Sequence, residues 1–157
     1  MSILLRLEGI TVAFAAPPKT GTVSITTIFG KFGWTREPYT LGPGKHVPIW
    51  SHDADYYLTA QREKEPWLRS CWQNIRTPIG VKPIDDMLLL KRGTFEAFSQ
   101  DYDERYPRHY EYLCQLYGRE GTATVIHAER LADDVADFLE VVHRRIIRAV
   151  PPQNVTP

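Results

Sequence analysis

The chain has 157 residues, with 19 Lys plus Arg and 19 Asp plus Glu, so its formal net charge at pH 7 is zero. This balance argues against broad binding to nucleic acid or to an anionic membrane, because both require an excess of basic side chains. No stretch is long and apolar enough to predict a transmembrane helix. The length fits one domain over residues 1–157, with 151–157 expected to be a loose tail.

Two features of the sequence indicate the cellular compartment. Cys71 and Cys114 fit no metal-ligand spacing and are interpreted as reduced thiols, with a disulfide between them as the alternative. Residues 1–16 resemble a signal peptide in having one Arg, apolar residues and a small-residue end. Glu8 and Gly9 interrupt that apolar run, so we expect no cleaved signal and a cytoplasmic location.

The segment after the first apolar run is predicted to bind an anion. Residues 10–16 predict a strand, which ends at a Pro-Pro pair, and the apolar spacing of 25–29 predicts a helix. A tight turn between them directs free backbone N–H groups, and the positive end of the helix dipole, at one point. Gly21 allows a ligand to approach the backbone, and Lys19 adds a mobile cation. Such a turn suits phosphate or sulfate, and its hydroxyl donors are Thr20, Thr22 and Ser24.

The remaining chain alternates between strand-like and helix-like segments. Residues 35–47 are rich in Gly and Pro and predict a loop. The further predicted strands are residues 47–50, 55–61 and 122–127. The further predicted helices are residues 66–76, 85–91, 94–98, 107–117 and 131–150. This alternation predicts an α/β domain with a mostly parallel central sheet flanked by helices, in which ligands bind at the carboxyl ends of the strands.

A second anion-binding element is predicted after the strand at 55–61. Arg62 comes directly after that strand, and Ser70 lies within the following helix. A guanidinium and a hydroxyl that are brought together by a strand-to-helix turn can bind one phosphate. The mixed charges of residues 62–69 are more typical of a solvated surface, so this element alone favours a surface role over a ligand site.

Together, the two elements resemble sulfotransferases that use 3′-phosphoadenosine 5′-phosphosulfate. Pro18-Lys19-Thr20-Gly21-Thr22-Val23-Ser24 is similar to the family's 5′-phosphosulfate loop, P-K-[ST]-G-[ST]-[ST]-[SW]. It departs from that pattern at Val23, which removes one hydroxyl but keeps the backbone N–H. The loop differs from the Walker A pattern, in which Lys follows the second Gly.

The segment from Arg62 to Ser70 resembles the family's 3′-phosphate element, R-x-P-x-x-W-x-R-S. Arg62, Trp67, Arg69 and Ser70 match it in register, whereas Lys64 stands where the family has Pro. Weaker similarity extends to 94–98 and 125–139, where Glu129 and Leu131 match a Glu-x-Leu pattern and are expected to have structural roles. The family's C-terminal nucleotide-binding segment, rich in Gly and Lys, has no evident counterpart. The resemblance therefore leaves open how the adenine is held.

The resemblance implies a P-loop-like sulfotransferase fold and a metal-free transfer of a sulfuryl group to a hydroxyl or amine. The N–H groups of residues 20–24 would then hold the donor's 5′-phosphate, and Arg62 and Ser70 its 3′-phosphate. Lys19 would stabilise charge on the bridging oxygen. The co-product would be adenosine 3′,5′-bisphosphate, and the acceptor a small molecule or a saccharide. Neither the acceptor's identity nor the oligomeric state follows from the sequence.

Histidine is the expected general base for the acceptor. His46 follows Gly44-Lys45 between the two phosphate elements, and related small sulfotransferases carry a Lys-His in a similar place. His52 is the alternative base, because Asp53 or Asp55 can orient it. Structural roles are expected for His109, His127 and His143, with a place in the lining of an acceptor pocket as the alternative for His109.

Two other functions fit part of the sequence. One is a nucleotide-dependent phosphotransferase with a degenerate phosphate loop, which needs a carboxylate for Mg²⁺ after a second strand. Gln61-Arg62 stands there instead, which disfavours this alternative. The other is a non-catalytic nucleotide-binding protein of the same fold.

Overall fold

The chain begins with two strands that fold back on each other. The computed structural model describes residues 2–37, 53–74, 93–118 and 123–149. Strands β1 (Ser2–Leu7) and β2 (Ile10–Ala15) pair antiparallel. The residues between them, Glu8 and Gly9, have φ angles of 47° and 80°. Turns with positive φ at both central positions match the twist of antiparallel strands, so these two residues close a hairpin.

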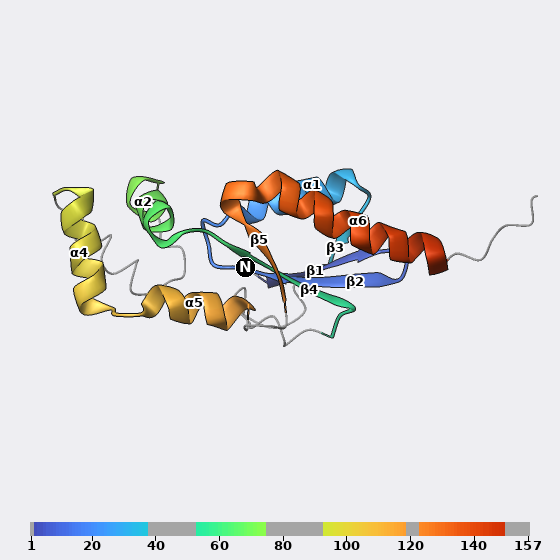
Figure 1. Ribbon diagram of the computed structural model, residues 1–157, viewed down its shortest axis with the longest axis horizontal. Coiled ribbons are helices and arrows are strands. Elements are labelled where there is room, and N and C mark those ends of the chain that lie inside the picture. Colours follow the sequence, from blue (N-terminus) through green and yellow to red (C-terminus); the bar gives the residue numbers. More distant parts are fainter. Residues whose placement is uncertain (1, 38–52, 75–92, 119–122, 150–157) are drawn as a thin grey trace, which may run out of the picture.

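The rest of the described chain alternates between helices and strands, as Figure 1 shows. The further strands are β3 (Thr35–Arg36), β4 (Tyr56–Gln61) and β5 (Thr124–His127). The helices are α1 (Thr22–Lys31), α2 (Lys64–Asn74), α4 (Phe95–Arg105), α5 (His109–Gly118), the 3-10 helix η2 (Ala128–Arg130) and α6 (Leu131–Ala149).

The sheet is mixed, which corrects the prediction that it is mostly parallel. Its strand order is β3-β1-β2-β4-β5. Strands β2, β4 and β5 run parallel, whereas β1 pairs antiparallel with both β2 and β3. The prediction failed because Glu8-Gly9 was interpreted as an interruption of an apolar run rather than as a hairpin turn. The parallel half carries both predicted phosphate elements at its carboxyl ends.

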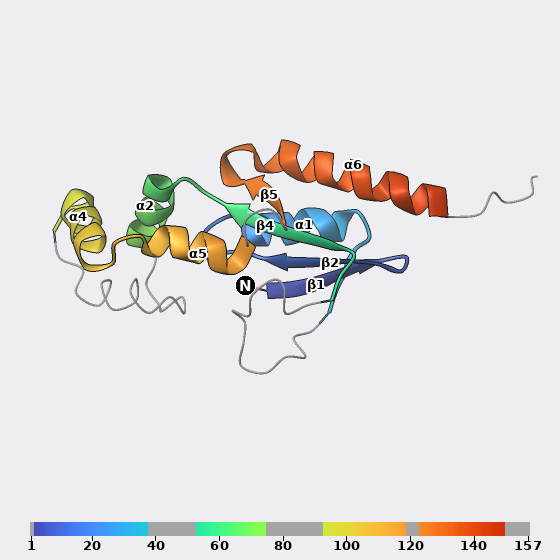
Figure 2. The same ribbon diagram turned by 60° about the horizontal axis from the view of Figure 1, so that its bottom comes forward.

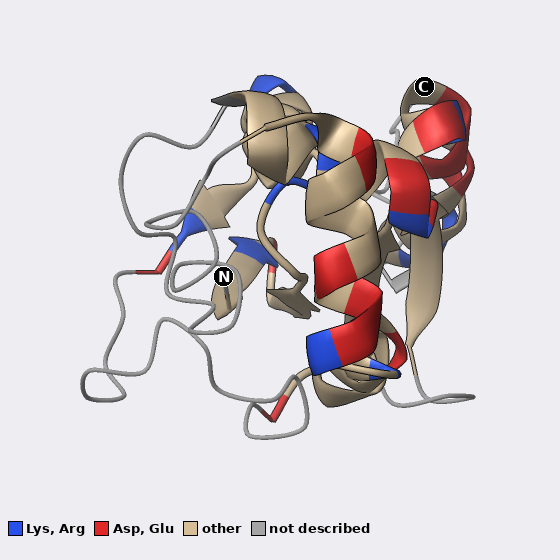
Figure 3. Cartoon of the chain, turned by 90° about the vertical axis from the view of Figure 1, so that its left-hand side faces the viewer, with Lys and Arg blue, Asp and Glu red and all other residues tan. Residues whose placement is uncertain are grey.

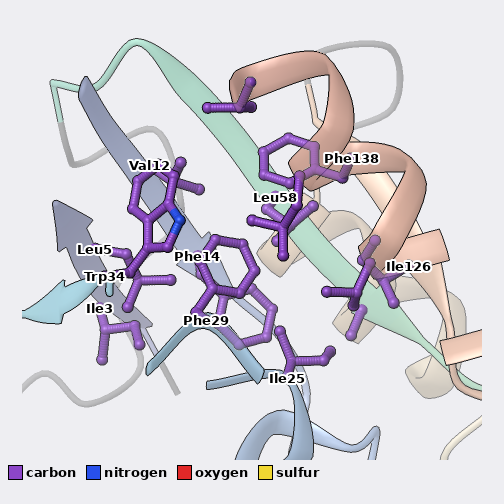
Figure 4. Close-up of a cluster of buried hydrophobic side chains, with 14 of the residues drawn as sticks. Ile3, Leu5, Val12, Phe14, Ile25, Phe29, Trp34, Leu58, Ile126 and Phe138 are labelled. Carbon is purple, nitrogen blue, oxygen red and sulfur yellow. The ribbon is translucent and has the colours of Figure 1, made fainter. Parts of the chain in front are cut away.

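The alternation of side chains along β2 separates two hydrophobic clusters. Val12 and Phe14 belong to one cluster, whereas Ala13 and Ala15 belong to the other, as expected from the period-two geometry of a strand. Helices α1 and α6 cover the first face (Figures 1 and 2). Figure 4 shows how the aromatic and aliphatic side chains from the strands and from these two helices fill that cluster.

The second cluster joins the opposite face of the sheet to the helices near its carboxyl end. Trp67 from α2, Phe98 and Tyr102 from α4, and Leu113 and Tyr117 from α5 are all buried there. In Figure 2 the arrowheads of β2 and β4 point toward the end of the molecule where α2 and α4 lie. Since the two clusters share one sheet, the described residues form a single α/β domain.

Most predicted elements within the described ranges are confirmed. Helix α4 extends well beyond the predicted 94–98, and its N-cap is Thr94, whose hydroxyl accepts the N–H of Ala97. Helix α5 begins two residues later than predicted. Strand β1 was not predicted. The segments predicted at 47–50 and 85–91, and the tail at 151–157, lie outside the described residues. None of the described helices has the length and apolarity needed to cross a membrane.

Candidate anion-binding site

The predicted strand, turn and helix are present as β2, the segment 16–21 and α1. Lys19 and Gly21 both have left-handed backbones, with φ angles of 65° and 89°. Successive N–H groups in turns of this kind form a concave anion site. Gly21 is the N-cap of α1, no side chain caps it, and the first turn contains no acidic residue. The first N–H groups of α1 are therefore left for an external acceptor or water.

The side chains of this turn are placed differently from one another. Thr20 is fully buried, and its hydroxyl donates to the carbonyl oxygen of Pro17 at 2.6 Å. Thr20 therefore stabilises the turn, and its role as a hydroxyl donor to a ligand stays a prediction. Thr22 is half-buried and Ser24 is exposed. Val23, where the pattern departs from the resembling family, leaves 75% of its surface exposed.

Gly21 is required for a reason that the sequence did not reveal. A Cβ atom at this position would lie 2.6 Å from Cδ1 of Leu131, the first residue of α6. The left-handed φ also disfavours any other residue type. Leu131 therefore packs directly on the turn, and this contact gives a physical basis to its predicted structural role. The contact with α6 is therefore sufficient to explain why position 21 requires glycine, whether or not a ligand binds.

The turn and the second predicted element lie side by side. Strands β2 and β4 are parallel neighbours, so their carboxyl ends meet at one edge of the sheet. The guanidinium Nη1 of Arg62 donates to the carbonyl oxygen of Lys19 at 3.4 Å, across 43 residues of sequence. The indole Nε1 of Trp67 donates to the carbonyl oxygen of Pro18 at 2.8 Å. Two separate side chains thus tie the end of β4 and the start of α2 to the turn.

Helix α2 carries the remaining residues of the second element. Ser70 is half-buried in this helix. The neighbouring Arg69 pairs with Glu65 at 3.3 Å, and its guanidinium lies 4.0 Å from the ring centre of Phe95 in α4. Arg69 is therefore turned toward α4. Lys64, which replaces the family's proline, pairs with Asp103 of α4 at 2.6 Å. Lys64 and Arg69 therefore both lie on the side of α2 that faces α4.

The predicted bases, His46 and His52, lie outside the described residues. The other three histidines have partners within the fold. His109 forms a 2.6 Å hydrogen bond with the hydroxyl of Tyr102, and burial lowers the pKa of His109. His143 accepts from the indole of Trp34 at 3.4 Å. His127 bonds to Asp134 through Nδ1 at 3.0 Å. These contacts agree with the expected structural roles.

A cavity of about 730 Å³ lies between α2 and α4, and its lining includes neither Lys19 nor Arg62. The two cations that line it, Lys64 and Arg69, are both paired with carboxylates. Acidic residues (red) are prominent on the helices at this end of the molecule (Figure 3). The further carboxylates in the lining are Glu96 and Glu104. This acidic lining is unsuited to a phosphate, so the turn before α1 remains the candidate anion site.

Comparisons of the chain with family models, with curated proteins and with solved structures gave no match.

Proposed function

We propose that the protein transfers a sulfuryl group from 3′-phosphoadenosine 5′-phosphosulfate to a hydroxyl or amine acceptor. The observation that supports this proposal most is the contact between Arg62 and the carbonyl of Lys19. A donor with two separate phosphate groups needs two anion-binding elements at one edge of a sheet. The two sequence elements that resemble the sulfotransferase pattern meet at such an edge, although 43 residues separate them.

The residues around the turn fit the phosphates of such a donor. The uncapped first turn of α1 offers backbone N–H groups for the 5′-phosphate, and Lys19 adds a positive charge beside them. Arg62 is assigned to the 3′-phosphate together with Ser70, because guanidinium and hydroxyl groups both donate to phosphate oxygens. Thr20 has its hydroxyl engaged with Pro17, so its contribution is limited to its backbone.

The proposed reaction is a single in-line displacement. His46 takes the proton from the acceptor as the acceptor's oxygen or nitrogen forms a bond to sulfur. The bond between sulfur and the bridging phosphate oxygen breaks, and Lys19 stabilises the negative charge that develops on that oxygen. Adenosine 3′,5′-bisphosphate leaves with the electron pair of that bond. The acceptor is a small molecule or a saccharide.

A thermal-shift comparison tests this proposal against its two rivals. The purified chain is heated with adenosine 3′,5′-bisphosphate, with ATP plus Mg²⁺, or without nucleotide. A ligand that binds only the folded state raises the melting temperature. We expect stabilisation by the bisphosphate alone. Stabilisation by ATP plus Mg²⁺ alone would instead support the phosphotransferase. Bisphosphate binding without turnover, across a screen of acceptors with labelled donor, would support the non-catalytic nucleotide-binding protein.

The Arg62→Ala variant tests the assignment of the 3′-phosphate. We expect it to weaken the binding of adenosine 3′,5′-bisphosphate far more than that of adenosine 5′-phosphate. The loss of one charge-assisted contact should cost about 1.5–3 kcal/mol of binding free energy. The control is Arg36→Ala, an exposed residue in β3 at the other end of the strand order. Calorimetry that finds equal weakening of both nucleotides would refute the assignment.

A further inference from the structure

The backbone of Arg62 is held by side chains from two other elements. Strand β4 ends at Gln61, so Arg62 and Glu63 lie beyond its last residue. The N–H of Glu63 donates to carboxylate Oε1 of Glu129 at 3.0 Å, across 66 residues of sequence. The backbone of Arg62 also approaches the hydroxyl of Tyr110, where it acts to lower the pKa of that hydroxyl. Side chains from η2 and α5 thus approach the main chain at two successive residues.

Tyr110 and Glu129 lie in different environments. Burial raises the pKa of Tyr110, and the backbone N–H of Arg62 acts in the opposite direction. Its ring also packs against Trp67, with ring centres 5.0 Å apart. Glu129 is exposed, and its bond from the Glu63 N–H lowers its pKa, with smaller contributions from the charges of Arg62 and His127. Tyr110 is therefore anchored by packing, whereas Glu129 acts mainly as a charged hydrogen-bond acceptor.

We propose that Glu129 and Tyr110 are positioning residues, which fix the main chain at Arg62 and so aim its guanidinium at the 3′-phosphate. The inference rests on the proposed function. A guanidinium at the end of a long side chain contributes more to ligand affinity when its backbone is already held in place. If the backbone is mobile, binding must also order it, and the lost conformational entropy reduces the affinity. The contact of Arg62 with Lys19 shows that its side chain already extends toward the turn.

The negative charge of Glu129 separates this role from direct ligand binding. A carboxylate near Arg62 repels a phosphate, so Glu129 helps binding only through its hold on the backbone. Glutamine keeps a carbonyl oxygen that can accept the Glu63 N–H, yet removes the charge. Alanine removes both. Glu129→Ala is therefore expected to weaken binding of the bisphosphate, whereas Glu129→Gln is expected to keep its affinity or raise it.

The test measures selectivity for the 3′-phosphate by calorimetry. The quantity compared is the ratio of the Kd for adenosine 5′-phosphate to the Kd for adenosine 3′,5′-bisphosphate. We expect Glu129→Ala to lower this ratio about tenfold, in the range typical of residues that orient a ligand-binding group. Tyr110→Phe keeps the ring but removes the hydroxyl, and it should also lower the ratio. Glu129→Gln should keep the ratio within about threefold of wild type or raise it.

Asp134→Ala is the matched control. Asp134 also accepts a backbone N–H at the end of a strand, that of His127 at 2.8 Å. Its loss should reduce stability while leaving the ratio unchanged. An unchanged ratio in both Glu129→Ala and Tyr110→Phe would overturn the inference, as would a Glu129→Gln variant that loses selectivity as fully as Glu129→Ala. A wild type that does not prefer the bisphosphate would overturn the proposed function itself, before any variant is compared.

Discussion

The indole of Trp67 donates a 2.8 Å hydrogen bond to the carbonyl oxygen of Pro18, and it joins the first turns of α2 to the loop before α1. Trp67 is fully buried in the second hydrophobic cluster. One side chain therefore belongs to the core and also determines the position of the loop. The position of the anion site is consequently coupled to the packing of α2 rather than determined by the loop sequence alone.

Trp67→Phe is expected to destabilise the protein and to weaken nucleotide binding. The Pro18 carbonyl loses its donor, which costs about 1–3 kcal/mol of unfolding free energy. The control is Trp34→Phe, which removes another buried indole donor, the one bonded to His143. Denaturant unfolding and calorimetry with adenosine 3′,5′-bisphosphate measure both effects. A Trp67→Phe variant that binds the nucleotide as tightly as Trp34→Phe does would contradict the coupling.

Gly21→Ala is expected to destabilise the protein more than Gly9→Ala. Both glycines have left-handed φ angles, but a Cβ at Gly9 would meet open space, whereas one at Gly21 would meet Leu131. Backbone strain of about 1–2 kcal/mol applies to both. The steric contact adds about 1–3 kcal/mol at Gly21 only. In a Leu131→Ala background the difference between the two variants should disappear, and a difference that persists would show that the contact is not its cause.

Lys19→Ala is expected to lower kcat. In the proposed reaction, charge on the bridging oxygen grows as the sulfuryl group departs, so an interaction with Lys19 would strengthen in the transition state and affect kcat rather than the donor KM alone. One such contact is worth about 10²–10³-fold in rate. Lys19→Arg should restore activity only in part, because a planar fork replaces a compact charge.

Saturation kinetics on the Lys19 variants, with circular dichroism to verify folding, measures this effect. Lys31→Ala, at the exposed far end of α1, serves as the control. A folded Lys19→Ala enzyme with wild-type kcat would remove the catalytic role of Lys19 and leave the protein as a binder.

His46→Ala is expected to abolish most turnover while donor binding survives. Loss of a general base costs about 10²–10⁴-fold in rate. This prediction depends on the sequence alone, since His46 and His52 both lie outside the described residues. The same assay on His52→Ala decides between them. Near-normal activity in His46→Ala together with an inactive His52→Ala would assign the base to His52.

Asp134 is expected to make stability depend on pH in the acid range. It accepts both the backbone N–H and the ring Nδ1 of His127, and these bonds lower its pKa. A carboxyl group with a lower pKa in the folded state stabilises the fold above its unfolded pKa. That stabilisation is lost as the pH falls through the folded value. Unfolding free energies of wild type and Asp134→Asn should therefore differ at pH 7, and the difference should shrink as the pH falls below about 4, the ordinary pKa range of Asp. A constant difference across this range would exclude the linkage.

The local elements of the candidate site follow from short stretches of sequence. The spacing of apolar residues over 10–16 and 25–29 indicates a strand and a helix, because each periodicity follows from backbone geometry within a few residues. Lys19, Gly21 and Arg62 were identified for the same reason, since each stands at a predicted strand end or turn. The helical spacing of apolar residues over 131–150 likewise predicts an amphipathic helix, and its apolar stripe is buried as expected at Val135 and Val142.

The way in which these elements meet depends on long-range pairing and packing. The hairpin at Glu8-Gly9 makes the sheet mixed, and the parallel pairing of β2 with β4 brings Arg62 to Lys19. The hydroxyl of Thr20 is bonded to the carbonyl of Pro17, while Leu131 and Glu129 approach from a distant segment. These contacts join residues tens of positions apart, and they depend on which strands pair and which faces pack. Local propensity carries no information about such pairings, because they are selected by the burial of the whole core.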